Sequence, residues 1–90
     1  MKQGLQLRKQ RKSVGVILEV LAEISGINAG EISRYETGKR KPNEVVRVKL
    51  EETFDAIRRV KELHAGVSIN LKDVKFLRTE IKKLQVAASN

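Results

Sequence analysis

The sequence predicts a small all-α protein of five helices, and three observations lead to this prediction. Apolar residues, almost all Leu, Ile, Val and Ala, recur at spacings of three and four residues instead of alternating in pairs. Six glycines and a single proline, Pro42, divide the chain into segments of helical length. With 90 residues, the chain has room for one hydrophobic core, and no segment has the composition of a linker. We therefore expect five helices that share one core.

The first two helices are short and are expected over residues 3–12 and 18–24. In the first, Leu7 is the inward-facing residue, and several cations near the end suit a helix C-terminus. Gly15 ends this helix. Gly26 follows the second helix at the position where a C-terminal glycine is common. The apolar stripe of the second helix comprises Leu18, Leu21, Ala22 and Ile24.

Capping residues mark the third helix, residues 28–36, more clearly than any other. Asn28 suits the N-cap position, and Glu31 follows three residues later, as in a capping box. Ile32 and Tyr35 supply an inward face, and Gly38 stops the helix. We therefore expect a short helix directly after a tight turn.

The fourth helix is the longest. Pro42 suits its start, and a 3.6-residue apolar period continues to about His64. The segment Ala65-Gly66-Val67 then breaks it. The inward residues are expected to be Val46, Leu50, Phe54 or Thr53, Ile57 and Val60.

The fifth helix follows a second capping signal. Asn70 is placed as its N-cap, with Asp73 at the third position, and the tail over residues 86–90 is expected to fray. Its apolar stripe comprises Leu71, Val74, Leu77 or Arg78, Ile81 and Leu84.

Composition excludes several classes of function. The chain has no cysteine and one histidine, His64, so we assign no catalytic residue, no metal site and no cofactor. Nineteen Lys and Arg against eleven Asp and Glu give a formal charge of +8 and a pI near 10.1, which indicates a polyanionic partner. No apolar run approaches the roughly 18 residues of a membrane span, and no signal-peptide pattern follows Met1. We expect a cytoplasmic protein that binds nucleic acid and no membrane.

The third helix belongs to a recognisable layout. A short helix, a three-residue turn with a glycine and a capped second helix are typical of a helix-turn-helix, whose second helix enters the major groove of DNA. Residues 21–42 resemble the phage-repressor (Cro/CI-type, XRE-type) helix-turn-helix family, and the likeness covers about residues 5–55. It implies a λ-repressor-like DNA-binding domain. The residues that occur together at the family's spacing are Leu21, Ala22, Gly26, Ile27, Ile32, Glu36 and Gly38.

The resemblance places the base contacts on the third helix. Arg34 is the strongest candidate, because a guanidinium pairs with both O6 and N7 of guanine. A phosphate contact and an ion pair with Glu31 are the alternatives for this arginine. Ala29 suits a thymine methyl, whereas Gly30 either permits close approach to DNA or is a tolerated poor helix former. The full set of expected base-contacting residues is Asn28, Ala29, Gly30, Ser33 and Arg34.

Phosphate contacts are expected just after this helix. A basic run there would lie along the DNA backbone beside the groove, although charge runs are often only solvated loops. Arg8 and Lys12 are weaker candidates for further contacts. The expected phosphate-contacting residues are Thr37, Gly38, Lys39, Arg40 and Lys41.

Two other positions follow from the resemblance. Arg11 and Glu36 are similar to the arginine and glutamate that join the first and third helices of such repressors through an ion pair; the alternative is two solvated charges. The family usually opens its second helix with a hydroxyl cap and a phosphate-binding glutamine, but Ile17 and Leu18 stand at those positions. We expect both to enlarge the core; the alternative is a partner surface. Phosphate binding from this helix is then left to its backbone N–H groups.

The function predicted is a sequence-specific regulator of transcription that binds double-stranded DNA, a dimeric repressor of phage or mobile-element type. Residues 1–64 would form the helix-turn-helix domain and residues 65–90 a helical extension for homodimerisation, since such proteins commonly pair on two half-sites. The expected dimerisation residues are Leu71, Val74, Leu77, Ile81 and Leu84. The alternative is that the fifth helix completes the monomer core, and both roles are compatible.

One alternative function belongs to another class. An antitoxin-like or anti-regulator module would use the C-terminal helix to bind a partner protein. Nonspecific nucleic-acid binding is a third possibility, because the base-reading surface is thin. An enzyme is not expected.

Overall fold

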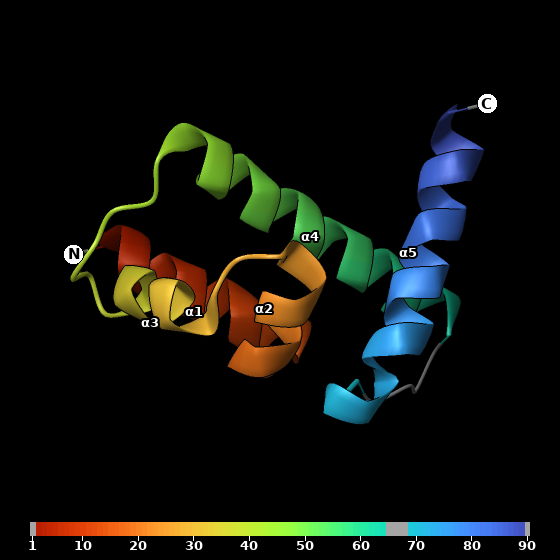
Figure 1. The fold of residues 1–90 in the computed structure, drawn as a ribbon, viewed down its shortest axis with the longest axis horizontal. Coiled ribbons are helices and arrows are strands. Elements are labelled where there is room, and N and C mark those ends of the chain that lie inside the picture. The colour runs from red at the N-terminus through yellow and green to blue at the C-terminus, as the bar shows by residue number, and fades with distance from the viewer. Residues whose placement is uncertain (1, 65–68, 90) are drawn as a thin grey trace.

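A computed structural model describes the backbone of residues 2–64 and 69–89 and the side chains of residues 6–64 and 69–85. Over this part of the chain the fold is all-α, with no strand (Figure 1). The five helices are α1 (Lys2–Val14), α2 (Leu18–Ser25), α3 (Ala29–Glu36), α4 (Glu44–Leu63) and α5 (Val74–Ser89). A 3-10 turn, Leu71–Asp73, leads directly into α5. The predicted fold class is therefore confirmed.

One hydrophobic cluster joins the helices. α1 packs against α3 and α4, and α2 packs against α3, α4 and α5. Both Phe54 and Thr53 lie inward on α4, so the two residues that the apolar period left open are both buried. The cluster comprises Leu7, Val14, Val16, Val20, Leu21, Ile32, Tyr35, Leu50, Phe54, Ile57, Val60, Ile69, Val74 and Leu77.

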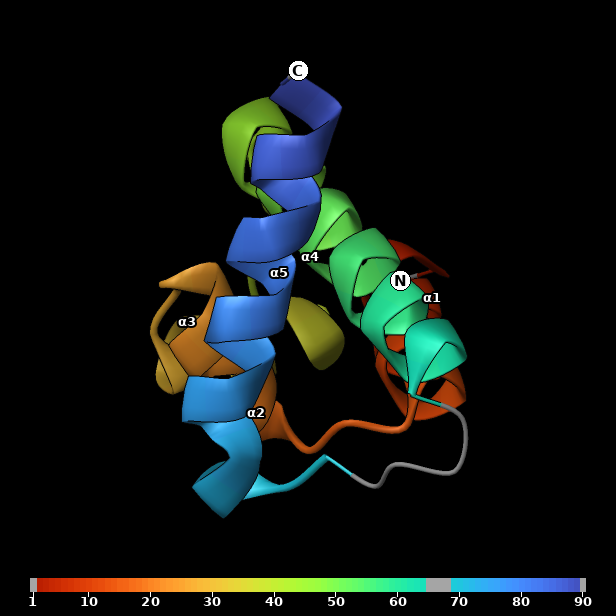
Figure 2. The same cartoon turned by 90° about the vertical axis from the view of Figure 1, so that its right-hand side faces the viewer.

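α5 folds back to complete this cluster. Leu77 is 0% exposed and Val74 is buried beside it, because α5 packs against both α2 and α4 (Figures 1 and 2). Ile81 and Leu84 are half-buried against the same cluster, whereas Leu71 is 52% exposed. Of the two roles expected for the fifth helix, core completion is therefore present within a single chain.

α4 begins two residues later than expected, at Glu44 instead of Pro42. Asn43 is its N-cap, and the side-chain Oδ1 of Asn43 accepts a hydrogen bond from the backbone N–H of Val46 at 2.9 Å. Pro42 therefore precedes the cap instead of opening the helix. An asparagine side chain satisfies a free N–H of the first turn, which a proline cannot do.

The other boundaries differ less. α1 extends to Val14, past the expected end at residue 12, and α5 stays helical to Ser89, where fraying was expected. The break expected at Ala65-Gly66-Val67 lies outside the described residues. The first turn of the fifth helix is 3-10, and within it the Asp73 carboxylate accepts a hydrogen bond from the Asn70 N–H at 3.1 Å.

Gly15 ends α1, as expected, and a lysine from α4 donates a hydrogen bond to a carbonyl group at that end. Gly15 has φ +81°, and its N–H donates to the carbonyl oxygen of Arg11 at 3.0 Å. The Nζ of Lys61 donates to the carbonyl oxygen of Val14 at 2.6 Å, so a cation satisfies the C-terminus of α1. A Cβ at Gly15 would lie 2.6 Å from this Nζ. The positive φ therefore requires glycine here, and any side chain would also displace the end of Lys61 from its hydrogen bond.

Candidate nucleic-acid interface

The turn between α2 and α3 is fixed by short-range hydrogen bonds. Gly26 has φ +77°, and its N–H donates to the carbonyl oxygen of Ala22 at 2.9 Å. Ser25 is buried, and its Oγ accepts a hydrogen bond from the N–H of Ile27 at 3.1 Å. The Asn28 side chain then caps α3 by accepting from the N–H groups of Gly30 at 2.8 Å and Glu31 at 3.4 Å. These bonds hold α3 at a defined angle to α2.

α3 buries one face and presents the other to solvent. Ile32 and Tyr35 are buried, and burial together with the nearby Glu31 carboxylate raises the pKa of Tyr35. All five expected base-contacting residues lie on or beside the outward face: Asn28, Gly30 and Arg34 are exposed, and Ala29 and Ser33 are half-buried.

Gly30 has a local explanation apart from DNA. A Cβ at this position would lie 3.0 Å from the Oδ1 of Asn28, the atom that caps the helix. A side chain at this position would therefore press on the capping oxygen, which would have to shift by a few tenths of an ångström.

A single carboxylate organises the cations of this surface. The Oε1 of Glu31 accepts hydrogen bonds from Arg34 at 2.7 Å and from Arg40 at 3.2 Å. Its Oε2 accepts from the hydroxyl of Tyr35 at 3.3 Å. Glu31 therefore does not complete the expected capping box; it holds two arginines at the edge of α3. The ion pair weighed as an alternative for Arg34 is present, and the Arg34 side chain is still 56% exposed.

The basic segment after α3 is folded against the end of that helix. The N–H groups of Lys39 and Arg40 both donate to the carbonyl oxygen of Arg34, at 2.9 and 3.2 Å. The Thr37 hydroxyl donates to the carbonyl oxygen of Ser33 at 3.0 Å. All five expected phosphate-contacting residues, Thr37, Gly38, Lys39, Arg40 and Lys41, are exposed. The segment thus extends the cationic edge of α3.

Arg11 and Glu36 form a bidentate ion pair between α1 and α3. Nε of Arg11 lies 2.6 Å from Oε2 of Glu36, and Nη2 lies 3.0 Å from Oε1. Nη1 of Arg11 also donates to the carbonyl oxygen of Val16 at 3.1 Å. The side chains are only 14% and 7% exposed. The hydrogen bonds to Glu36 raise the pKa of Arg11 against the opposing effect of burial.

The start of α2 departs from the family pattern in structure as well as in sequence. Ile17 occupies the N-cap position with no side-chain cap bond and is 49% exposed, so the expectation that it enlarges the core is wrong. The extended backbone at the cap points this side chain outward. Leu18 is half-buried against the core, as expected. The first turn also carries Glu19, which disfavours a phosphate at this helix end.

Three long-range polar contacts were not foreseen from the sequence. Arg78 of α5 donates to the carbonyl oxygen of Glu23 at 2.9 Å and to its carboxylate at 3.1 Å. The Nε2 of His64 lies 2.9 Å from Oε1 of Glu80. Lys61 caps α1, as described above. No local pattern marks such pairs, because their partners are far apart in the chain.

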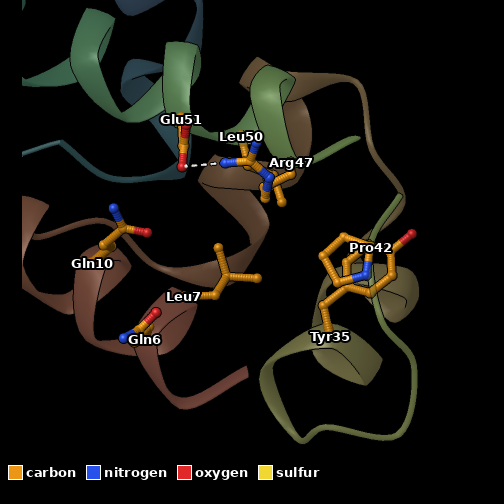
Figure 3. Close-up of a pocket in the computed structure, with 8 residues that line it drawn as sticks. All are labelled: Gln6, Leu7, Gln10, Tyr35, Pro42, Arg47, Leu50 and Glu51. Atoms are coloured by element: carbon orange, nitrogen blue, oxygen red, sulfur yellow. Dashed lines mark hydrogen bonds and ion pairs between the residues drawn. The ribbon is translucent and has the colours of Figure 1, made fainter. Parts of the chain in front are cut away.

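The cleft in Figure 3 lies between α1, α3 and the first half of α4. Polar and apolar side chains alternate around it: Gln6, Leu7, Gln10, Tyr35, Pro42, Arg47, Leu50 and Glu51. Arg47 is held by Glu44 at 2.6 Å and Glu51 at 3.0 Å, and the hydrogen bond to Glu44 raises its pKa. The charged groups of the cleft are therefore paired with one another. The cleft brings together no acid and base suited to catalysis.

The part of the chain that the structure describes shows neither a group of metal-binding side chains nor a membrane-spanning helix. Among the described residues, no three His, Cys, Asp or Glu side chains are grouped to hold a metal ion. Residues 2–64 and 69–89 also contain no helix long and apolar enough to cross a membrane.

The short α2, the fixed turn and the capped, outward-facing α3 define a helix-turn-helix fold of the DNA-binding class. A helix-turn-helix family model matches residues 7–58, more than half of the chain. The chain belongs to this family, the Cro/CI-like (XRE) helix-turn-helix proteins, which are DNA-binding regulators of transcription. No curated protein and no solved structure matches the chain.

Proposed function

We propose that the protein is a sequence-specific, dimeric repressor that reads double-stranded DNA with α3. The observation that carries this proposal is the outward face of α3, where exposed Arg34 stands on a helix fixed by the Asn28 cap and the Arg11–Glu36 pair. A recognition helix held in this way has little backbone freedom to lose on binding.

The cationic residues of α3 and of the segment after it have two different roles. Arg34 contacts base edges and sets the preferred sequence, with Asn28, Ala29, Gly30 and Ser33 beside it in the groove. Arg40, with Lys39, Lys41 and the residues at 37 and 38, binds phosphates and sets the position of the domain on the duplex. Repression then follows from occupation of a promoter.

A second copy of the chain supplies the other half-site. Val74 and Leu77 are buried within the subunit, which leaves Leu71, Ile81 and Leu84 of the expected stripe for a dimer contact. A single domain of this kind covers little DNA, and pairing on half-sites one helical turn apart raises affinity. The alternative, a partner protein on the same side chains, predicts a heterocomplex during purification.

Selection from random duplexes tests the proposal. The full chain is incubated with a library of random 30-base-pair duplexes, bound DNA is amplified, and fluorescence anisotropy compares the selected duplex with a shuffled one. The expected result is one enriched motif with two related halves and tighter binding to the selected duplex. Equal binding of both duplexes would overturn sequence specificity, and a single unrepeated half-site would overturn the dimer.

A further inference from the structure

One edge of α5 carries a row of cations. Lys75, Arg78 and Lys82 follow one another at spacings of three and four residues, so they share one face of the helix, and all three are exposed. We call these three residues the α5 basic stripe. They line a shallow groove together with Ile24 of α2 and with Thr79, Ile81 and Gln85 of α5. The stripe therefore lies along the α2 side of α5.

The stripe leads to the start of α3. Arg78 also lines a second groove whose other residues include Leu71, Gly26, Asn28 and Ala29. Gly26, Asn28 and Ala29 form the turn and the first residue of α3, whereas Leu71 lies in the 3-10 turn before α5. α5 packs against α2 and α4, and Figure 1 shows α2 between α5 and α3, whereas Figure 2 looks at the molecule from the α5 side. Arg78 is thus the residue of the stripe that borders the start of α3.

The α5 basic stripe carries positive charge that is available to an external anion. Glu19 and Glu23 line the second groove, but Arg78 neutralises Glu23 at 3.1 Å. Among the described residues, neither Lys75 nor Lys82 has a carboxylate within 4.0 Å. Two lysine charges are left to meet an external anion.

The start of α2 itself offers little positive charge to DNA. The start of α2 offers Ile17 and Leu18 in place of a polar phosphate clamp, with Glu19 in the same turn. An anion that approached this end would meet only backbone N–H groups beside a carboxylate. Lys75 and Lys82 line a groove with Ile24, in the last turn of α2, and so add positive charge beside the opposite end of that helix.

We propose that the α5 basic stripe binds the DNA phosphate backbone next to the segment read by α3, beyond the N-terminal end of that helix. This inference rests on the proposed function. The C-terminal helix then has two tasks in one subunit: Leu77 and Val74 complete the core, and Lys75 and Lys82 extend the DNA contact. Arg78 holds the stripe against α2 through Glu23.

The test compares two double variants with the same change of charge. In the first, Lys75→Gln and Lys82→Gln remove the two available charges of the stripe. In the second, the control, Arg59→Gln and Lys83→Gln remove exposed cations on α4 and on α5, where Lys83 is bound to Glu80 at 3.0 Å. Thermal melting of both double variants verifies that they fold.

Anisotropy titrations over a range of salt concentrations give the slope of log K against log salt for the selected duplex. We expect the stripe variant to lose about 1 in slope for each lysine per bound subunit, and the control much less. The ratio of affinities for selected and shuffled duplexes should not change, because phosphate contacts carry no sequence information. Shortening the flanks of the duplex should weaken the wild type and not the stripe variant.

The outcomes separate this inference from the proposed function. Equal slopes for the two double variants would overturn the stripe, since only net charge would then matter. A wild type that binds selected and shuffled duplexes equally would overturn the proposed function. In that case a smaller slope for the stripe variant alone would still support a phosphate contact by α5.

Discussion

At the scale of single residues, Arg11 stands out because its charged side chain is largely buried and hydrogen-bonded. Its guanidinium spans both oxygens of Glu36 and the carbonyl oxygen of Val16, largely out of solvent. We predict that Arg11→Met lowers the free energy of unfolding by about 3 kcal/mol, because the Glu36 charge is left buried without a partner.

Urea denaturation measures the effect. The matched control is Arg58→Met, which breaks an exposed pair with Asp55 at 2.8 Å and should cost less than about 1 kcal/mol. Equal effects of the two variants would show that the Arg11–Glu36 pair contributes no more than a surface contact.

Glu31 determines where the cations of α3 stand before DNA arrives. Arg34 and Arg40 must both leave this carboxylate to reach bases or phosphates. An exposed pair of this kind contributes up to about 1 kcal/mol, so Glu31→Gln should tighten binding to the selected duplex by up to about fivefold. The anisotropy titration uses Glu52→Gln on α4 as a control of equal charge. Weaker binding by the Glu31 variant alone would mean that this carboxylate positions the arginines for DNA.

At the scale of elements, His64 and Glu80 link the end of α4 to α5. The hydrogen bonds from His64 and then Lys83 lower the pKa of Glu80. A carboxylate with a lowered pKa in the folded state stabilises the fold above its ordinary pKa, and this contribution is lost as the pH falls through the folded value.

Glu80→Gln should therefore reduce the melting temperature at pH 7, and the difference from wild type should close as the pH falls below about 4. Melting curves between pH 7 and pH 2.5 measure both. A difference that stays constant with pH would mean that the charge of Glu80 makes no contribution.

The sequence predicted helices best where a capping residue and an apolar period agree. Asn28 with Ile32 and Tyr35 predicted α3 to within one residue, because the cap and the buried face are both local features. At the start of α4 two local signals competed, and the side chain of Asn43 prevailed over Pro42. Ile17 was misplaced because helical periodicity does not apply to the residue before a helix, where the backbone is extended.

At the scale of the whole molecule, α5 is part of the domain that carries the DNA-binding helices. Leu77 is 0% exposed within the shared cluster. We predict that Leu77→Ala lowers the free energy of unfolding by about 3 kcal/mol through the cavity that it leaves. Leu63→Ala, at a side chain 65% exposed and outside the proposed dimer contact, is the control and should have a small effect. Similar costs measured by denaturation would contradict an integral α5.

Polar contacts between distant parts of the chain could not be predicted from the sequence. Arg78 with Glu23 and Lys61 with Val14 join residues 55 and 47 positions apart, and no spacing rule connects them. The resemblance to a family placed Arg11 next to Glu36, since that pair lies within its motif. It gave no information about α5, which lies beyond the matched residues 7–58.

In the proposed function, α3 reads the DNA sequence through Arg34. The most direct measurement is the ratio of dissociation constants for the shuffled and selected duplexes, by anisotropy, for the wild type, Arg34→Ala and the charge-matched control Arg58→Ala. We predict that Arg34→Ala lowers this ratio by about 5- to 150-fold, as the loss of a bidentate guanine contact requires, and that Arg58→Ala leaves it unchanged. An unchanged ratio for Arg34→Ala would contradict the proposal that Arg34 reads the base sequence.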